Sequence, residues 1–111
     1  MKVRVTVESP YAGDVDRNVA YLKRALLDSV NRGEAPLASH LFYTQFLDDA
    51  VPFERETGID CGLTWAEQAQ KMCFYVDYGF TTGMLRARAF ALRRAIEMEE
   101  RSIGENRRQE K

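Results

Sequence analysis

The sequence has too few cysteines and histidines for a disulfide framework or a zinc site. Cys61 and Cys73 are its two cysteines, and His40 is its single histidine. A structural zinc ion takes four ligands of these types, so a His/Cys metal cluster is nearly excluded. We therefore expect no metal and no cofactor, and we expect both thiols to be buried in a protein of a reducing compartment.

An excess of basic residues and a long apolar run are also missing. The net charge is −1, whereas a protein that reads duplex DNA usually carries a basic excess. No apolar run approaches the roughly 20 residues that span a bilayer. The N-terminus alternates charged and apolar residues, unlike a signal peptide. We therefore expect no nucleic-acid polymer and no membrane as partner, and we expect a cytoplasmic protein of the bacterial cytosol.

What the sequence does contain is a regular succession of strand and helix patterns. Val3, Val5 and Val7 alternate with charged and polar residues, which predicts a strand. The apolar run at residues 72–76 suits a strand covered on both faces, as in parallel sheets. Two further strands are predicted, at residues 35–38 and 96–103.

Helical patterns separate these strands. The first helix has an apolar stripe at steps of three and four, made by Val15, Val19, Leu22, Leu26 and Val30. Gly33 suits the end of that helix. A second helix is predicted over residues 52–68, with a break or bend near Gly58 and Gly62. A third helix is predicted to begin near Gly83. The type of secondary structure at residues 41–47 is left open.

The order β-α-β-α-β-α-β predicts an α/β domain with a sheet of four or five mainly parallel strands and helices on both faces. The domain is expected to span residues 1–104, and residues 105–111 form a charged tail. Ligands of such sheets bind at the carboxyl ends of the strands, near the point where the strand order reverses. Three loops are therefore candidates for function, at residues 9–14, 39–41 and 77–83.

The first loop, with the sequence SPYAGD, is the richest in candidate ligand-binding groups. Ser9 and Tyr11 offer hydroxyl groups, and Gly13 allows close approach of a ligand to the backbone. Free N–H groups and the following helix N-terminus could hold a phosphate or sugar oxygen. The alternative is a plain turn in which Asp14 caps the helix. The chain contains neither a GxGxxG fingerprint nor a Walker motif.

Other ligand-binding candidates lie on the remaining loops and helices: His40, Asp60, Asp77, Thr82, Gly83 and Arg86. Among these, His40 and Asp60 are the two candidates for a catalytic role. A lone histidine is more often a structural hydrogen-bonding group. Thr82 and Gly83 open a helix and could bind an anion or simply cap it. Arg86 could reach a phosphate or lie on a solvated helix face.

The aromatic residues at 42–46 have two possible roles. They could stack against a base, or they could form an apolar patch between two copies of the chain, and we favour the second. Trp65 is expected to be a core residue.

The ordered motifs resemble one family. They are SPYAG at 9–13, GEAP at 33–36, SHL at 39–41, YTQFLDD at 43–49, ETGID at 56–60 and GM at 83–84. Over residues 3–103 the chain resembles the small, often phage-encoded relatives of nucleoside 2-deoxyribosyltransferases. The resemblance implies a flavodoxin-like or Rossmann-like three-layer sandwich, a homodimer or higher homo-oligomer, and a pocket for a nucleoside or nucleotide.

The resemblance also implies a covalent mechanism, in which a glutamate of the third helix attacks the anomeric carbon of the sugar. Ala87 occupies the position of that glutamate here, and an alanine cannot form the intermediate. Three functions therefore stay open. The chain transfers or hydrolyses an N-glycosidic bond, or it binds nucleotides as a sensor, sponge or regulatory module, or it is a structural homo-oligomer.

Overall fold

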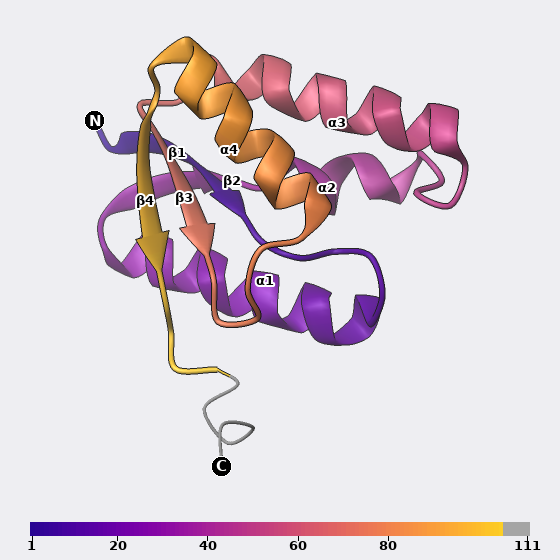
Figure 1. Ribbon diagram of the computed structural model, residues 1–111. Coiled ribbons are helices and arrows are strands. Elements are labelled where there is room, and N and C mark those ends of the chain that lie inside the picture. Colours follow the sequence, from indigo (N-terminus) through magenta and orange to yellow (C-terminus); the bar gives the residue numbers. More distant parts are fainter. Residues whose placement is uncertain (106–111) are drawn as a thin grey trace.

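The computed structural model describes residues 1–105, so most of the expected tail, at 106–111, lies outside the described residues. The elements follow one another along the chain as β1 (Val3–Glu8), α1 (Val15–Asn31), β2 (Glu34–Leu37), α2 (Ser39–Phe42), the 3-10 helix η1 (Tyr43–Gln45), α3 (Pro52–Ala66), β3 (Lys71–Tyr75), α4 (Thr82–Arg94) and β4 (Glu97–Arg101) (Figure 1).

The four strands form one sheet in the order β2-β1-β3-β4, and every neighbouring pair is parallel. The predicted α/β class and the flavodoxin-like or Rossmann-like architecture are therefore confirmed, with four strands in the described residues. The chain runs from β1 to β2 on one side and then crosses back to β3 on the other. The strand order thus reverses between β1 and β3, where ligands of such sheets bind.

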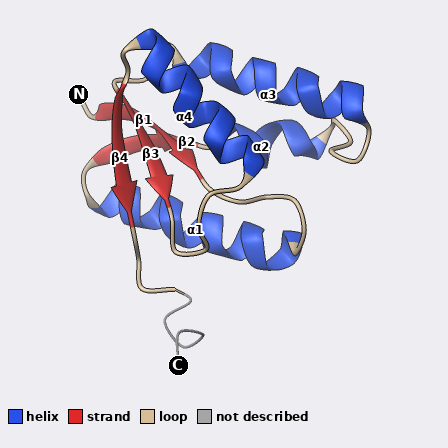
Figure 2. Cartoon of the chain, viewed as in Figure 1, coloured by secondary structure: helices blue, strands red, loops and turns tan. Residues whose placement is uncertain are grey.

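Helices cover both faces of the sheet and make three layers (Figure 2). On one face Tyr21 and Leu22 of α1 pack against Val5 and Val7 of β1 and Tyr75 of β3. On the other face, Ala66 of α3 and four residues of α4 pack against β3. The residues of this second core are Ala66, Met72, Phe74, Met84, Ala87, Phe90 and Ala91.

The buried face of α1 differs from the predicted stripe. Val15 and Val30 are exposed, whereas the polar residues Asn18 and Ser29 are buried. The Asn18 amide donates hydrogen bonds to the carbonyls of Tyr11 and Ala12, at 2.9 and 3.1 Å. The Ser29 hydroxyl donates to Glu34 at 2.7 Å. Because both polar groups have hydrogen-bond partners, these bonds offset the cost of removing the groups from water, and the two residues can face the interior.

The expected break in the second helix is wrong, because α3 is continuous from Pro52 to Ala66. Its two glycines lie where other segments come close. A side chain at Gly62 would meet Ser39 of α2, and a side chain at Gly58 would meet Leu47. The glycines allow close packing here and do not interrupt the helix.

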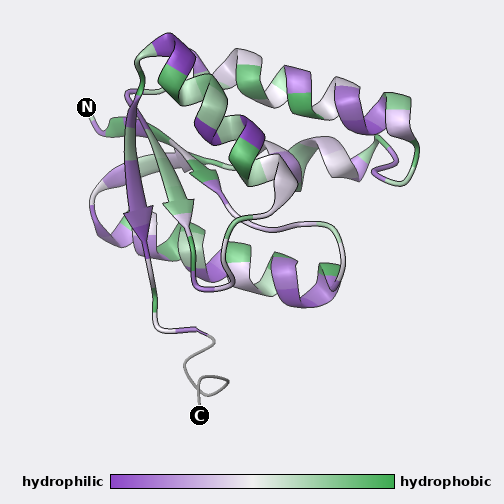
Figure 3. Cartoon of the chain, viewed as in Figure 1, coloured by the Kyte–Doolittle hydropathy of each residue, from purple (hydrophilic) through white to green (hydrophobic). Residues whose placement is uncertain are grey.

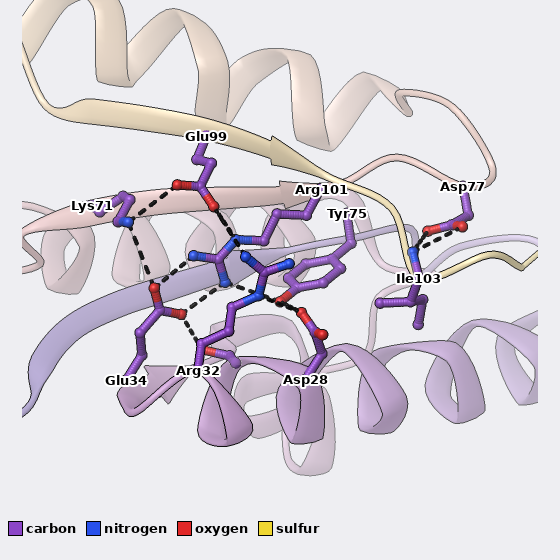
Figure 4. Close-up of polar contacts among 10 residues, drawn as sticks. Asp28, Arg32, Glu34, Lys71, Tyr75, Asp77, Glu99, Arg101 and Ile103 are labelled. Atoms are coloured by element: carbon purple, nitrogen blue, oxygen red, sulfur yellow. Dashed lines mark hydrogen bonds and ion pairs between the residues drawn. The ribbon is translucent and has the colours of Figure 1, made fainter.

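A buried ionic cluster joins α1 to three strands (Figure 4). The Arg101 guanidinium donates to both carboxylate oxygens of Glu34, at 2.7 and 2.6 Å, and to the Tyr75 hydroxyl at 3.0 Å. It also pairs with Glu99, and Lys71 lies 3.6 Å from Glu34. Hydrogen bonding to Arg101 lowers the pKa of Glu34 to about 2.

The two edge strands are β2, which is short, and β4, which is mostly charged. Figure 3 shows β4 as largely hydrophilic, next to the hydrophobic β3. Its sequence is EMEER, and β2 contains Pro36. Among the described residues, no helix has the length and apolar character needed to cross a membrane.

Candidate functional site

A pocket of about 270 Å³ lies at the carboxyl end of β1. We call it the β1 pocket. Its walls come from the end of β1 and the loop that follows, from α2 and η1, from α3, and from the start of α4. It therefore lies on the face of the sheet covered by α3 and α4, beside the point where the strand order reverses. This is the location that the strand order predicts for a ligand.

The loop after β1 brings Ser9 and Tyr11 to this pocket. Asn18 holds the loop in place through its bonds to the Tyr11 and Ala12 carbonyls. Gly13 has a φ of 98°, which a residue with a side chain rarely adopts. Gly13 lines an adjoining hollow rather than the β1 pocket itself.

Ser9 and His40 form a hydrogen-bonded pair in the wall of the pocket. The Ser9 hydroxyl lies 3.0 Å from Nε2 of His40, and the Tyr11 ring packs edge-on against the imidazole, with 6.5 Å between the ring centroids. Burial disfavours the charged imidazolium and lowers the pKa of His40 to about 4. His40 is therefore neutral at pH 7, and its low pKa makes it a weak base, so orienting Ser9 suits it better than accepting a proton.

The start of α4 forms another wall. The Thr81 side chain accepts a hydrogen bond from the Met84 N–H at 3.2 Å and so caps the helix. Thr82 and Gly83 also line the pocket. Ala87 lies one turn further along α4 and lines the pocket with a side chain that is 3% exposed. The position at which the resemblance places a glutamate therefore does lie in the pocket wall, but it carries a methyl group.

Glu8 is a pocket residue that the sequence reasoning missed. Its Cα pairs in register with Phe74, which packs beneath α4, so the Glu8 side chain lies on the α3 and α4 face of the sheet. It is half-buried and lines the pocket. Burial raises the pKa of its carboxyl to about 7, although the Thr6 side chain opposes the rise.

Strand alternation already contained the signal for Glu8. Val5 and Val7 face α1, so Thr6 and Glu8 must face the other helical layer. In a sheet covered on both faces, such a carboxyl cannot be a solvated surface group.

The remaining wall is partly apolar and partly charged. Leu47, Ile59 and Leu63 supply aliphatic surface, and Tyr43 supplies an aromatic ring. The charged residues of this wall are Asp49, Glu54 and Arg55. A mainly apolar wall with a few polar groups is typical of small-molecule sites.

Several predicted ligand-binding residues lie outside the β1 pocket lining, each for a physical reason. Asp14 caps α1, accepting a bond from the Arg17 N–H at 3.2 Å. Asp60 is exposed on α3. Arg86 is paired with Glu56 at 2.8 Å.

Asp77 also lies outside the pocket lining. Its carboxylate accepts hydrogen bonds from Tyr21 at 2.6 Å, from Ser102 at 2.7 Å and from the Ile103 N–H at 3.0 Å. Burial alone would raise the pKa of Asp77, but these hydrogen bonds outweigh it and lower the pKa. Asp77 thus anchors the segment after β4 to the end of β3.

Trp65 is not the expected core residue. It is 56% exposed on α3, and its indole N–H donates to the Tyr43 hydroxyl at 3.0 Å. Within residues 1–105, no group of three or more His, Cys, Asp and Glu side chains is placed to hold a metal ion.

Comparison with protein families gives one match. The family model described as a domain of unknown function (DUF7768) matches residues 3–101. This match spans nearly the whole described chain, and the chain belongs to that family. No curated protein and no solved structure matched the chain.

Proposed function

We propose that this member of the DUF7768 family binds a nucleoside or nucleotide in the β1 pocket. One observation carries the proposal. Five candidate residues that the sequence scatters over three loops, Ser9, Tyr11, His40, Thr82 and Gly83, line a single pocket. That pocket lies where parallel α/β sheets bind their ligands. The sequence resemblance to relatives of nucleoside 2-deoxyribosyltransferases points to the same class of ligand.

The two sides of the pocket suit the two parts of a nucleoside. The hydroxyls of Ser9, Tyr11 and Thr82 can exchange hydrogen bonds with sugar oxygens. The ring of Tyr43 and the aliphatic side chains of Leu47 and Ile59 offer surface for a base. The volume of about 270 Å³ is near the lower end for ligand pockets and suits a small ligand.

A second candidate function is cleavage or transfer of the N-glycosidic bond. The observation that favours it is Glu8, whose carboxyl lines the same pocket as Ala87, the position at which the resemblance places a glutamate. Because the pKa of Glu8 is about 7, both protonation states are populated at neutral pH. Such a group can give a proton to a leaving base or act as a carboxylate.

Binding is tested by the melting temperature of the full chain with a panel of deoxynucleosides and their 5′-monophosphates. A ligand at 100 times its Kd adds about 2.7 kcal/mol of stability, which corresponds to a rise on the order of 10 °C for a domain of this size. Ser9→Ala and Tyr11→Phe should reduce the rise. Asp60→Asn, which changes an exposed residue outside the pocket, should not. The absence of a rise for every ligand would refute the proposal.

Catalysis is tested separately, by chromatographic detection of free base after incubation with the ligands that bind. The second candidate predicts release of base by the natural sequence and a strong loss of release in Glu8→Gln. Binding without any release identifies the chain as a non-catalytic binder.

A further inference from the structure

The charged side chains that line the β1 pocket are unbalanced. The lining contains three carboxyls, those of Glu8, Asp49 and Glu54, and a single cationic side chain among the described residues, that of Arg55. When the three carboxyls are ionised, the lining carries a net charge of −2. His40 adds no charge at pH 7, because burial lowers its pKa to about 4.

The one cation in the lining already has a partner. Arg55 lies 3.9 Å from Asp49. By contrast, no cation of the described residues lies within ion-pair distance of Glu8, although Glu8 is half-buried at the end of β1 between the buried residues Thr6, Val7 and Ser9. Glu54 likewise has no paired cation among the described residues, so Glu8 and Glu54 carry the negative charge of the pocket that no cation compensates.

The start of α4 opposes this negative charge only in part. A helix N-terminus is equivalent to roughly half a positive charge. One of its N–H groups, that of Met84, is already bonded to Thr81. Half a positive charge is smaller than the single charge of an ionised Glu8, so an anion that enters the pocket meets net repulsion.

We propose that Glu8 is a specificity determinant that excludes phosphorylated ligands from the β1 pocket and favours uncharged nucleosides. The inference rests on the proposed function and names the ligand class within it. A phosphate monoester carries a charge of about −1.5 to −2 at pH 7, and like charges repel strongly in a pocket with little water. Rejection by a like charge is a common way for a site to exclude a competitor.

Calorimetric titration of the full chain at pH 8 tests this inference, with one deoxynucleoside and its 5′-monophosphate as ligands. We expect the nucleoside to bind at least tenfold more tightly, a difference of about 1.4 kcal/mol. In Glu8→Gln the preference for the nucleoside over the monophosphate should shrink at least threefold. In Glu97→Gln, which removes the same charge from an exposed residue at the opposite end of the sheet, the preference should be unchanged.

The outcomes separate the two proposals. If the monophosphate binds as tightly as the nucleoside, or if Glu8→Gln keeps the full preference, the inference about Glu8 is wrong and the proposed function stands. If neither ligand binds at millimolar concentration, both the proposed function and the inference about Glu8 are wrong.

A second measurement needs no variant. A nucleoside 5′-methyl phosphodiester keeps one negative charge across neutral pH. Because Glu8 binds a proton as the pH falls through about 7, the preference for the nucleoside over this diester should be smaller at pH 6 than at pH 8. The titratable groups around Glu8 in the lining are His40, Tyr11, Tyr43, Asp49, Glu54 and Arg55. A preference that does not change with pH would overturn the role of Glu8.

Discussion

At the scale of single residues, the pKa values of two glutamates are shifted in opposite directions. Glu34 has Arg101 as a bidentate partner, and its pKa is lowered to about 2. Glu8 has no cation within ion-pair distance among residues 1–105, and burial raises its pKa to about 7. The same side-chain type therefore stabilises the fold at one position and costs stability at the other, and the two effects appear in different pH ranges.

Glu34→Gln should destabilise the protein by about 3 kcal/mol at pH 7, because it leaves Arg101 buried without its main counter-charge. The folded pKa of Glu34 lies below the unfolded value of 4.5, so its contribution is present above pH 4.5 and is lost as the pH falls toward 2. Urea unfolding at pH 7 and pH 3 measures both effects. The exposed Glu100→Gln is the control and should change stability by less than about 0.5 kcal/mol. Equal stabilities for Glu34→Gln and the natural sequence at pH 7 would contradict the prediction.

Glu8→Gln should have the opposite effect. The folded pKa of Glu8 lies above the unfolded value, so the folded state holds the proton more tightly between about pH 4.5 and 7. The stability of the natural sequence therefore falls as the pH rises through that range and is level above it. We expect Glu8→Gln to be more stable than the natural sequence by about 1 to 3 kcal/mol at pH 8. The two should be similar at pH 4, and chemical unfolding without ligand provides the measurement.

At the scale of elements, the site depends on how closely α2 packs against α3. A Cβ atom added at Gly62 would lie 2.3 Å from Oγ and 2.9 Å from Cβ of Ser39. Oγ can rotate away, but Cβ moves only if α2 moves. Since α2 carries His40, a shift of α2 also disturbs the pair that His40 forms with Ser9.

Gly62→Ala should therefore destabilise the protein by about 1 to 3 kcal/mol through overpacking, although alanine is the better helix former. Gly58→Ala is the matched control on the same helix. Its added Cβ would meet Leu47 and Tyr43 at ordinary contact distances of 3.5 and 3.7 Å, so we expect it to stabilise the protein by about 0.5 to 1 kcal/mol. Thermal unfolding of both variants tests the pair, and equal stabilisation by both would show that α2 and α3 are not tightly packed.

The order and type of the strands and long helices could be predicted from the sequence, because these elements have regular apolar patterns. The buried face of α1 and the continuity of α3 could not. Asn18 and Ser29 are buried because loop carbonyls and Glu34 satisfy their polar groups. Those partners lie outside the helix, so the apolar periodicity of the helix does not reveal them. Gly62 looked like an interruption because its neighbour, Ser39, comes from a different segment.

The candidate site, too, could be predicted from the sequence only in part. Ser9, Tyr11, His40, Thr82 and Gly83 could be placed at one edge of the sheet by topology alone. Asp77 follows β3 at that edge too, but its carboxylate is already hydrogen-bonded to Tyr21 and to the segment after β4. These hydrogen-bond partners decide whether a polar group at this edge faces the pocket or is bonded within the fold.

At the scale of the whole molecule, Phe42 at the end of α2 and Phe46 just after η1 form an exposed aromatic group. Phe42 and Phe46 are 57% and 62% exposed, and their rings contact each other with centroids 5.4 Å apart. Exposed apolar surface of this kind is common at interfaces between subunits. A homodimer or higher homo-oligomer through this surface remains a prediction.

Replacing both Phe42 and Phe46 by Ser should lower the molecular mass measured by sedimentation equilibrium from that of an oligomer to that of a single chain, because the apolar contact is lost. Leu92→Ser is the control, since Leu92 is similarly exposed but lies on α4. An oligomer that survives the double substitution, or a natural sequence that is already monomeric near 100 µM, would show that this surface has another role.

The edges of the sheet constrain any assembly further. An open edge strand can pair with a strand from another chain, and repeated pairing of this kind leads to fibrils or disordered precipitates. Here β2 is four residues long and contains Pro36, which lacks an N–H to donate, and four of the five residues of β4 are charged. Both features discourage strand addition. We therefore expect any association of this chain to use its helical surfaces, and we expect the chain to resist amyloid-like aggregation even when it is concentrated.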